Sequence, residues 1–99
     1  MAPLHPKLSM LADTVRDLFY AEELVRQVRK AIEAEPVRFA GVRSWSDLDE
    51  RCDANEFIGD VDAVLGLEMP DDGDALDAYF TRASAATVAV DEWLQEANP

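Results

Sequence analysis

The apolar residues of the first third of the chain recur at helical spacing. From Leu8 to Ala34 neither proline nor glycine interrupts the sequence, and the apolar positions follow intervals of three and four residues, as on one face of a helix. They are Leu8, Leu11, Val15, Leu18, Phe19, Val25, Val28 and Ile32. Pro36 ends the pattern, because helical geometry is disfavoured for the residue before a proline. We predict one long helix over residues 8–34.

A second long amphipathic stretch lies near the end of the chain. Its apolar and small residues occupy one helical face: Leu76, Tyr79, Phe80, Ala83, Ala86, Thr87, Val90, Trp93 and Leu94. Ala83 and Ala86, in the middle of this face, permit a neighbouring helix to approach closely. We predict a helix over residues 74–97.

The middle of the chain, SDLDERCDANEFIGDVDAVL from Ser46 to Leu65, does not behave as one straight helix. Leu48 and Cys52 would lie on one side of it, and Phe57 and Val61 on nearly the opposite side. The pattern therefore predicts two short helices, over about residues 47–54 and 56–65.

Capping residues mark the ends of these two helices. Ser46 is predicted to cap the first, with Asp49 as the reciprocal acid of a capping box, and Asn55 to cap the second. Gly66 is predicted to end the second helix in left-handed conformation.

Together these elements predict an all-α fold: a small helical bundle in one domain, residues 1–99. Its two long helices, 8–34 and 74–97, are expected to pack antiparallel, with the two short helices bridging them. Residues 1–6 are expected to be mobile.

Charge is distributed unevenly along the chain. The net charge is −12, yet residues 1–43 hold seven basic and six acidic residues, whereas residues 44–99 hold fifteen acids against two arginines. Such a negative field repels nucleic acids and anionic membranes and attracts basic proteins. We therefore expect no direct binding to either. Most of these acids are expected on the solvated faces of helices.

The residue inventory disfavours catalysis and bound cofactors. His5, the one histidine, is expected to be inert, and no histidine accompanies Cys52 to activate it. Cys52 is expected to be a small buried hydrophobe, and Trp45 and Trp93 to be core anchors. The spacing of the acids matches no calcium-binding loop. We expect a non-enzyme without cofactor or metal.

The cysteine count and the hydropathy of the chain predict its cellular location. A single cysteine excludes a disulfide within the chain. The N-terminal MAPLHPKLSM has no apolar run typical of a secretory signal, and no stretch is long and apolar enough for a membrane span. These features predict a cytoplasmic protein.

The segment SWSDLDERCDANEFIGD, with AVDEWL near the C-terminus, resembles a family of small, acidic, uncharacterised proteins of bacteria and their phages. The residues that match are Ser46, Leu48, Asp53, Ala54, Asn55, Val90 and Trp93, and the resemblance covers about half of the chain. It implies no catalytic residue. It implies a structural junction at residues 53–55 and a source in phages or other mobile elements.

The leading functional hypothesis is a non-catalytic interaction or inhibitor protein whose acidic second half docks on a basic surface of a partner protein. A nucleic-acid-handling enzyme is the expected target, by analogy of size and charge with phage inhibitors of host defence and with nuclease immunity proteins. The candidate contact residues are Asp47, Asp49, Glu50, Asp53, Glu56 and Asp60.

Two alternatives remain open. The chain could be a structural or assembly protein that forms a homodimer through its long first helix, with acidity that serves only solubility. Metal-dependent hydrolysis is the third hypothesis, and it requires carboxylates gathered in a cleft.

Overall fold

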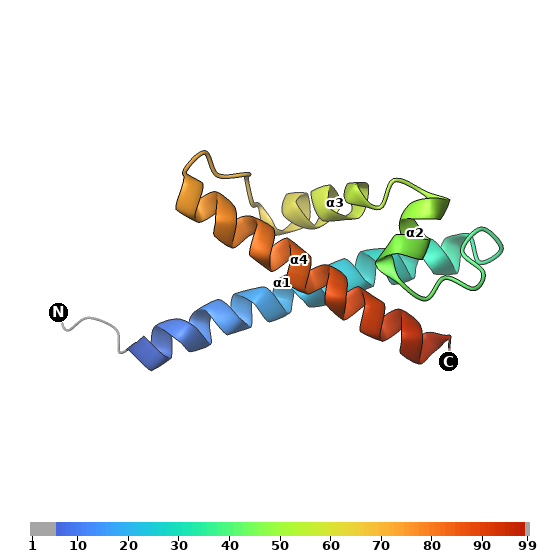
Figure 1. Ribbon diagram of the computed structural model, residues 1–99, viewed down its shortest axis with the longest axis horizontal. Coiled ribbons are helices and arrows are strands. Elements are labelled where there is room, and N and C mark those ends of the chain that lie inside the picture. Colours follow the sequence, from blue (N-terminus) through green and yellow to red (C-terminus); the bar gives the residue numbers. More distant parts are fainter. Residues whose placement is uncertain (1–5, 99) are drawn as a thin grey trace.

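The computed structural model describes the backbone of residues 6–98 and the side chains of residues 16–98. Its four helices are α1 (Pro6–Ala34), α2 (Trp45–Arg51), α3 (Asn55–Leu65) and α4 (Gly73–Ala97), and the described residues form no strand. The predicted all-α class, with two long helices and two short ones between them, is confirmed (Figure 1). His5 and most of the predicted mobile segment 1–6 lie outside the described residues.

The two long helices pack on one another, but the antiparallel orientation predicted for them is wrong. Asp17 contacts Arg82, and Val25 lines the same groove as Trp93, so the two helices advance in the same general direction. Figure 1 shows the reason: the chain runs back through α2 and α3 before α4 begins. A short loop would impose an antiparallel pair, whereas this returning connection does not.

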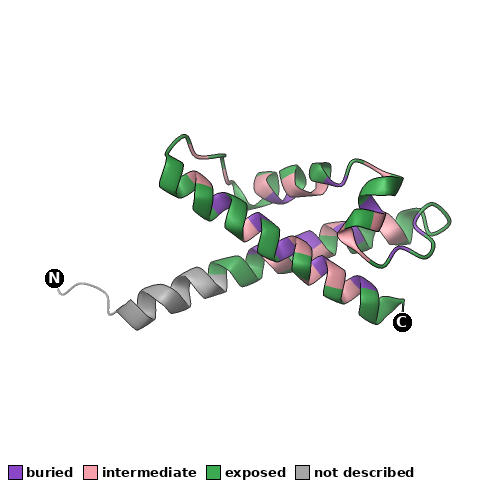
Figure 2. Cartoon of the chain, in the orientation of Figure 1, coloured by how far each residue is buried: buried purple, intermediate pink, exposed green. Residues whose placement is uncertain are grey.

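The core lies where α1, α3 and α4 meet. Tyr20, Leu24 and Val28 on α1 are buried at intervals of four residues, and Val61 on α3 faces them. The contribution of α4 is Tyr79, Ala83, Ala86, Val90 and Leu94, as its apolar pattern predicts. Figure 2 shows the buried positions along the facing sides of these helices.

The apolar stripe predicted on α1 is partly wrong. Leu18 and Phe19 are 56% and 59% exposed, whereas Tyr20 and Leu24, which are absent from that stripe, are almost completely buried. Apolar residues occur on several sides of α1, so the positions of α3 and α4 decide which side is covered.

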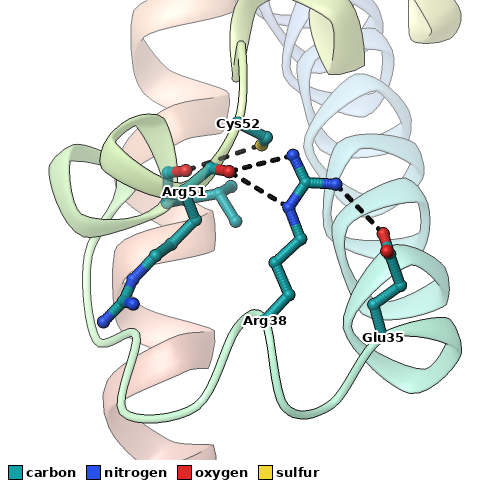
Figure 3. Close-up of polar contacts among 5 residues, drawn as sticks. Glu35, Arg38, Arg51 and Cys52 are labelled. Atoms are coloured by element: carbon teal, nitrogen blue, oxygen red, sulfur yellow. Dashed lines mark hydrogen bonds and ion pairs between the residues drawn. The ribbon is translucent and has the colours of Figure 1, made fainter.

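The N-cap of α2 lies two residues before the predicted one. Ser44, not Ser46, is the cap, and its Oγ accepts a hydrogen bond of 3.0 Å from the backbone N–H of Asp47. Arg38, on the preceding loop, donates from Nε and Nη2 to the carbonyl oxygen of Arg51, at 3.1 and 3.0 Å. It also pairs with Glu35, at 3.2 Å (Figure 3). The loop after α1 is thereby attached to the C-terminal end of α2.

The junction before α3 also differs from the prediction. Asn55 is the first residue of α3 rather than its cap, and its N–H donates to Asp53 Oδ1 at 3.3 Å. The end of α3 is as predicted: Gly66 has a φ of 67°, in the left-handed region. This conformation lets the N–H of Leu67 donate to the carbonyl of Asp62 at 2.8 Å.

Candidate functional site

The ion pairs of this protein use acids from its first half. Each of the four pairs in the described part of the chain joins an arginine to Asp17, Glu23, Glu33 or Glu35. Even Arg82, one of the two arginines after residue 43, pairs with Asp17 on α1, at 3.2 Å. Among residues 44–98, therefore, no carboxylate forms an ion pair with any of the described side chains, those of residues 16–98.

Three of the six predicted contact residues have structural roles. Asp47 is half-buried and accepts from the backbone N–H of Arg43 at 3.1 Å. Asp49 Oδ1 accepts from the N–H of Ala54 at 3.1 Å, and Asp53 accepts from Asn55. These carboxylates hold the ends of α2 and α3, so their loss would affect folding as well as any contact surface.

The other three predicted contact residues are exposed. Glu50 lies on α2, and Glu56 and Asp60 lie one helical turn apart on α3. The structure thus places them on two successive helices and does not gather the six residues into one pocket. Of the six, these three are the carboxylates most available to a partner.

Asp62 departs from the solvated face on which its sequence pattern placed it. It is half-buried, and its Oδ1 accepts a hydrogen bond of 3.0 Å from the hydroxyl of Tyr20. Its Oδ2 accepts from the hydroxyl of Tyr79. The available sequence signal was its spacing of four residues from Ile58, which places Asp62 beside the apolar stripe.

The two tyrosines are held in their protonated form. Burial, together with the hydrogen bond to Asp62, raises the pKa of Tyr79 to about 12 and raises the pKa of Tyr20 in the same direction. The guanidinium of Arg82 also lies 5.9 Å from the centre of the Tyr20 ring. Through the two hydrogen bonds to Asp62, the cluster connects α1, α3 and α4.

Two grooves flank this cluster. The first, the α3–α4 groove, has a volume of about 580 Å³; its lining includes Asn55, Ile58, Gly59, Met69, Phe80 and Ser84. The second, the α1 groove, has a volume of about 460 Å³; its lining includes Arg16, Phe19, Arg26 and Leu65. The two grooves differ in charged residues: Arg16, Arg26, Glu22 and Glu23 line the α1 groove, whereas Asp62 is the charged residue in the described lining of the α3–α4 groove.

The remaining candidate residues have structural surroundings. Cys52 is half-buried, its thiol lies 3.5 Å from the carbonyl oxygen of Leu48, and burial raises its pKa. Trp45 and Trp93 pack at the edge of the core, and the Trp45 ring meets Phe57 edge-on. Among the described side chains, no three of His, Cys, Asp and Glu gather closely enough to hold a metal ion.

Comparisons with known proteins assign no family to this chain. No protein-family description, no curated protein and no solved structure matches this chain. None of the helices in the described part of the chain has both the length and the apolar character needed to cross a lipid bilayer.

Proposed function

We propose that this protein is a non-catalytic interaction protein that binds a basic surface of a partner protein through its acidic second half. The supporting observation is the distribution of ion pairs. Four arginines, Arg26, Arg29, Arg38 and Arg82, pair with acids of the first half. Exposed carboxylates after residue 43, such as Glu50, Glu56 and Asp60, therefore remain available to an external cation. Opposite charge on two surfaces accelerates their encounter and selects the partner.

A nucleic-acid-handling enzyme is the proposed partner class. Such enzymes present basic surfaces to phosphate groups, and an acidic protein that covers such a surface would act as an inhibitor. Phage inhibitors of host defence enzymes are proteins of this kind, and we extend the proposal to that role by analogy of charge and size.

The first test is capture of partners from a bacterial lysate by the immobilised chain. We expect the captured proteins to be basic, to dissociate between low and moderate salt, and to be displaced by duplex DNA. Substitution of Glu50, Glu56 and Asp60 by lysine should abolish capture without loss of helix content. Asp49 and Asp53 are left intact, because they hold backbone N–H groups.

A matched control separates the location of the charge from its total. Substitution of Glu22, Glu33 and Glu35 by lysine changes the net charge by the same amount but alters the first half of the chain. We expect this variant to retain capture. Equal loss of capture in both variants would show that capture depends only on the net charge of the chain. Retention of capture in both variants would refute docking through the acidic second half.

A second candidate function, self-association through α1, is supported by one observation. Leu18 and Phe19 are adjacent, large and more than half exposed, and an exposed apolar patch is typical of a contact surface. This candidate predicts a dimer whose mass, measured by light scattering, is insensitive to salt. Substitution of both residues by serine should yield monomers, and a monomeric parent chain would exclude it.

A further inference from the structure

The α3–α4 groove has exposed apolar side chains at its mouth. Met69 is 61% exposed and Phe80 is 50% exposed, and both line the groove, beside the half-buried Ile58. α3 and α4 each pack on α1 and make few contacts with one another, so this apolar surface is not covered by the described part of the chain. Large exposed apolar residues around a concave surface are characteristic of a binding site.

Gly59, in the same groove, is not explained by the fold. It lies in the interior of α3 without a positive φ, and a Cβ atom built on it would meet no other atom within 4 Å. A glycine in a helix interior is less stable there than alanine, because its backbone loses more freedom. Neither backbone geometry nor internal packing requires glycine here. Without a side chain at this position, an external backbone can approach α3 closely.

Exposed acids flank this groove, and Asp62 is the carboxylate in its lining. On α3, Glu56 is exposed, follows the lining residue Asn55 and lies one turn before Gly59. On α4, Asp77 is exposed one turn before Phe80 and lies on the same side of the helix. No basic residue of the described part of the chain lines the groove. An apolar floor between carboxylates is complementary to an apolar stripe flanked by lysine and arginine.

We propose that the α3–α4 groove binds a basic amphipathic helix of a partner protein. The apolar face of that helix lies against Ile58, Met69 and Phe80, and its backbone passes Gly59. Its flanking lysines and arginines meet Glu56 and Asp77. Insertion of an amphipathic helix into an apolar groove is a common mode of recognition. This inference depends on the proposed function and specifies its contact surface and its partner.

The α1 groove does not suit the same occupant. Its lining holds two arginines, Arg16 and Arg26, and two acids, Glu22 and Glu23. Because these charges balance, and Arg26 pairs with Glu23 at 3.5 Å, the groove offers no net negative charge to a basic helix. We therefore expect substitutions at the α3–α4 groove, and not at the α1 groove, to affect binding. Phe19, which is exposed in the α1 groove, provides the control position.

The test uses a synthetic helical peptide as the probe, with leucine at every third or fourth position and lysine or arginine between. Its affinity for the full chain is measured by fluorescence anisotropy at near-physiological salt. Gly59→Leu fills the groove and should weaken binding by at least about tenfold. Ala63→Leu adds the same side chain four residues later on α3, outside the groove lining, and should leave the affinity unchanged, as should Phe19→Ser.

A second peptide separates groove binding from charge attraction alone. It retains every lysine and arginine but has glutamine in place of leucine, and it should bind at least about tenfold more weakly than the first. Equal binding of the two peptides, or unchanged affinity of a Gly59→Leu chain with normal helix content, would overturn the proposal. A dimer of the free chain that Gly59→Leu dissociates would also overturn it, by assigning the groove to a second copy.

Lysate capture distinguishes failure of this inference from failure of the proposed function. Gly59→Leu carries no charge change, so loss of capture in this variant supports the groove as the contact surface. If the Glu50, Glu56 and Asp60 variant loses capture while Gly59→Leu retains it, docking stands and the groove assignment fails. If both variants retain capture, both proposals fail.

Discussion

The hydroxyl of Tyr20 donates a hydrogen bond of 3.0 Å to Asp62 Oδ1, across 42 positions of the sequence. The other carboxylate oxygen of Asp62 accepts from Tyr79. One side chain of α3 is therefore tied to α1 and to α4 at once. Since α3 and α4 make few direct contacts, this carboxylate provides a connection between the two helices that border the groove.

Removal of this carboxylate should destabilise the fold. Asp62→Ala leaves the buried hydroxyls of Tyr20 and Tyr79 without their acceptor. We expect the free energy of unfolding, measured by urea denaturation, to fall by about 2–3 kcal/mol. Asp60→Ala, on the exposed side of the same helix, should change it by less than about 0.5 kcal/mol. Equal effects would show that the tyrosine contacts add no stability.

The same cluster predicts a loss of stability in alkali. The pKa of Tyr79 is raised to about 12 in the folded chain, and that of Tyr20 is also raised, against an ordinary value of 10.0. Above about pH 10 the unfolded chain releases these protons before the folded chain does, so rising pH favours unfolding. Below that pH the two tyrosines contribute no pH dependence.

Urea denaturation of the parent chain and of a Tyr79→Phe variant, at about pH 8 and about pH 11, measures this effect. The parent should lose more stability between the two conditions than the variant, which lacks one of the two titrating phenols. An identical loss in both chains would contradict the role of Tyr79.

Two serines near the start of α2 allow a direct test of its cap. Ser44→Ala removes the oxygen that accepts from the N–H of Asp47 and should lower the free energy of unfolding by about 1 kcal/mol. Ser46→Ala should change it by less than about 0.5 kcal/mol, because Ser46 is exposed within α2. Thermal denaturation of both variants provides the comparison, and the reverse order would place the cap at Ser46.

Two glycines should respond to alanine in opposite directions. Gly59→Ala enters open space in an ordinary helix and should raise the free energy of unfolding by about 0.5–1 kcal/mol. Gly66→Ala places a Cβ atom at a φ of 67° and should lower it by about 1–2 kcal/mol. Urea denaturation measures both. Destabilisation by Gly59→Ala would mean that the folded chain itself requires glycine there.

Local chemistry allowed the helices to be predicted from sequence. The signals of Pro36, Gly66 and the apolar intervals of α3 and α4 depend on residues close in sequence. The end of α1, the bounds of α3 and α4 and the left-handed end of α3 were therefore foreseeable, whereas α2, predicted over about 47–54, runs from Trp45 to Arg51. The cap of α2 was misplaced, because Ser44 and Ser46 have the same chemistry. Only backbone geometry shows which of the two hydroxyls faces the N–H of Asp47.

The sequence by itself determined an all-α chain with two long helices, two short ones and an excess of carboxylates after residue 43. Only the tertiary structure decided that α1 and α4 run in the same direction, that Tyr20 rather than Phe19 is buried, and that Asp62 joins three helices. The physical reason is the sequence separation over which each interaction acts. Helical periodicity and capping depend on residues only a few positions away along the chain. Burial and the pairing of a carboxylate depend on which distant helix covers which face.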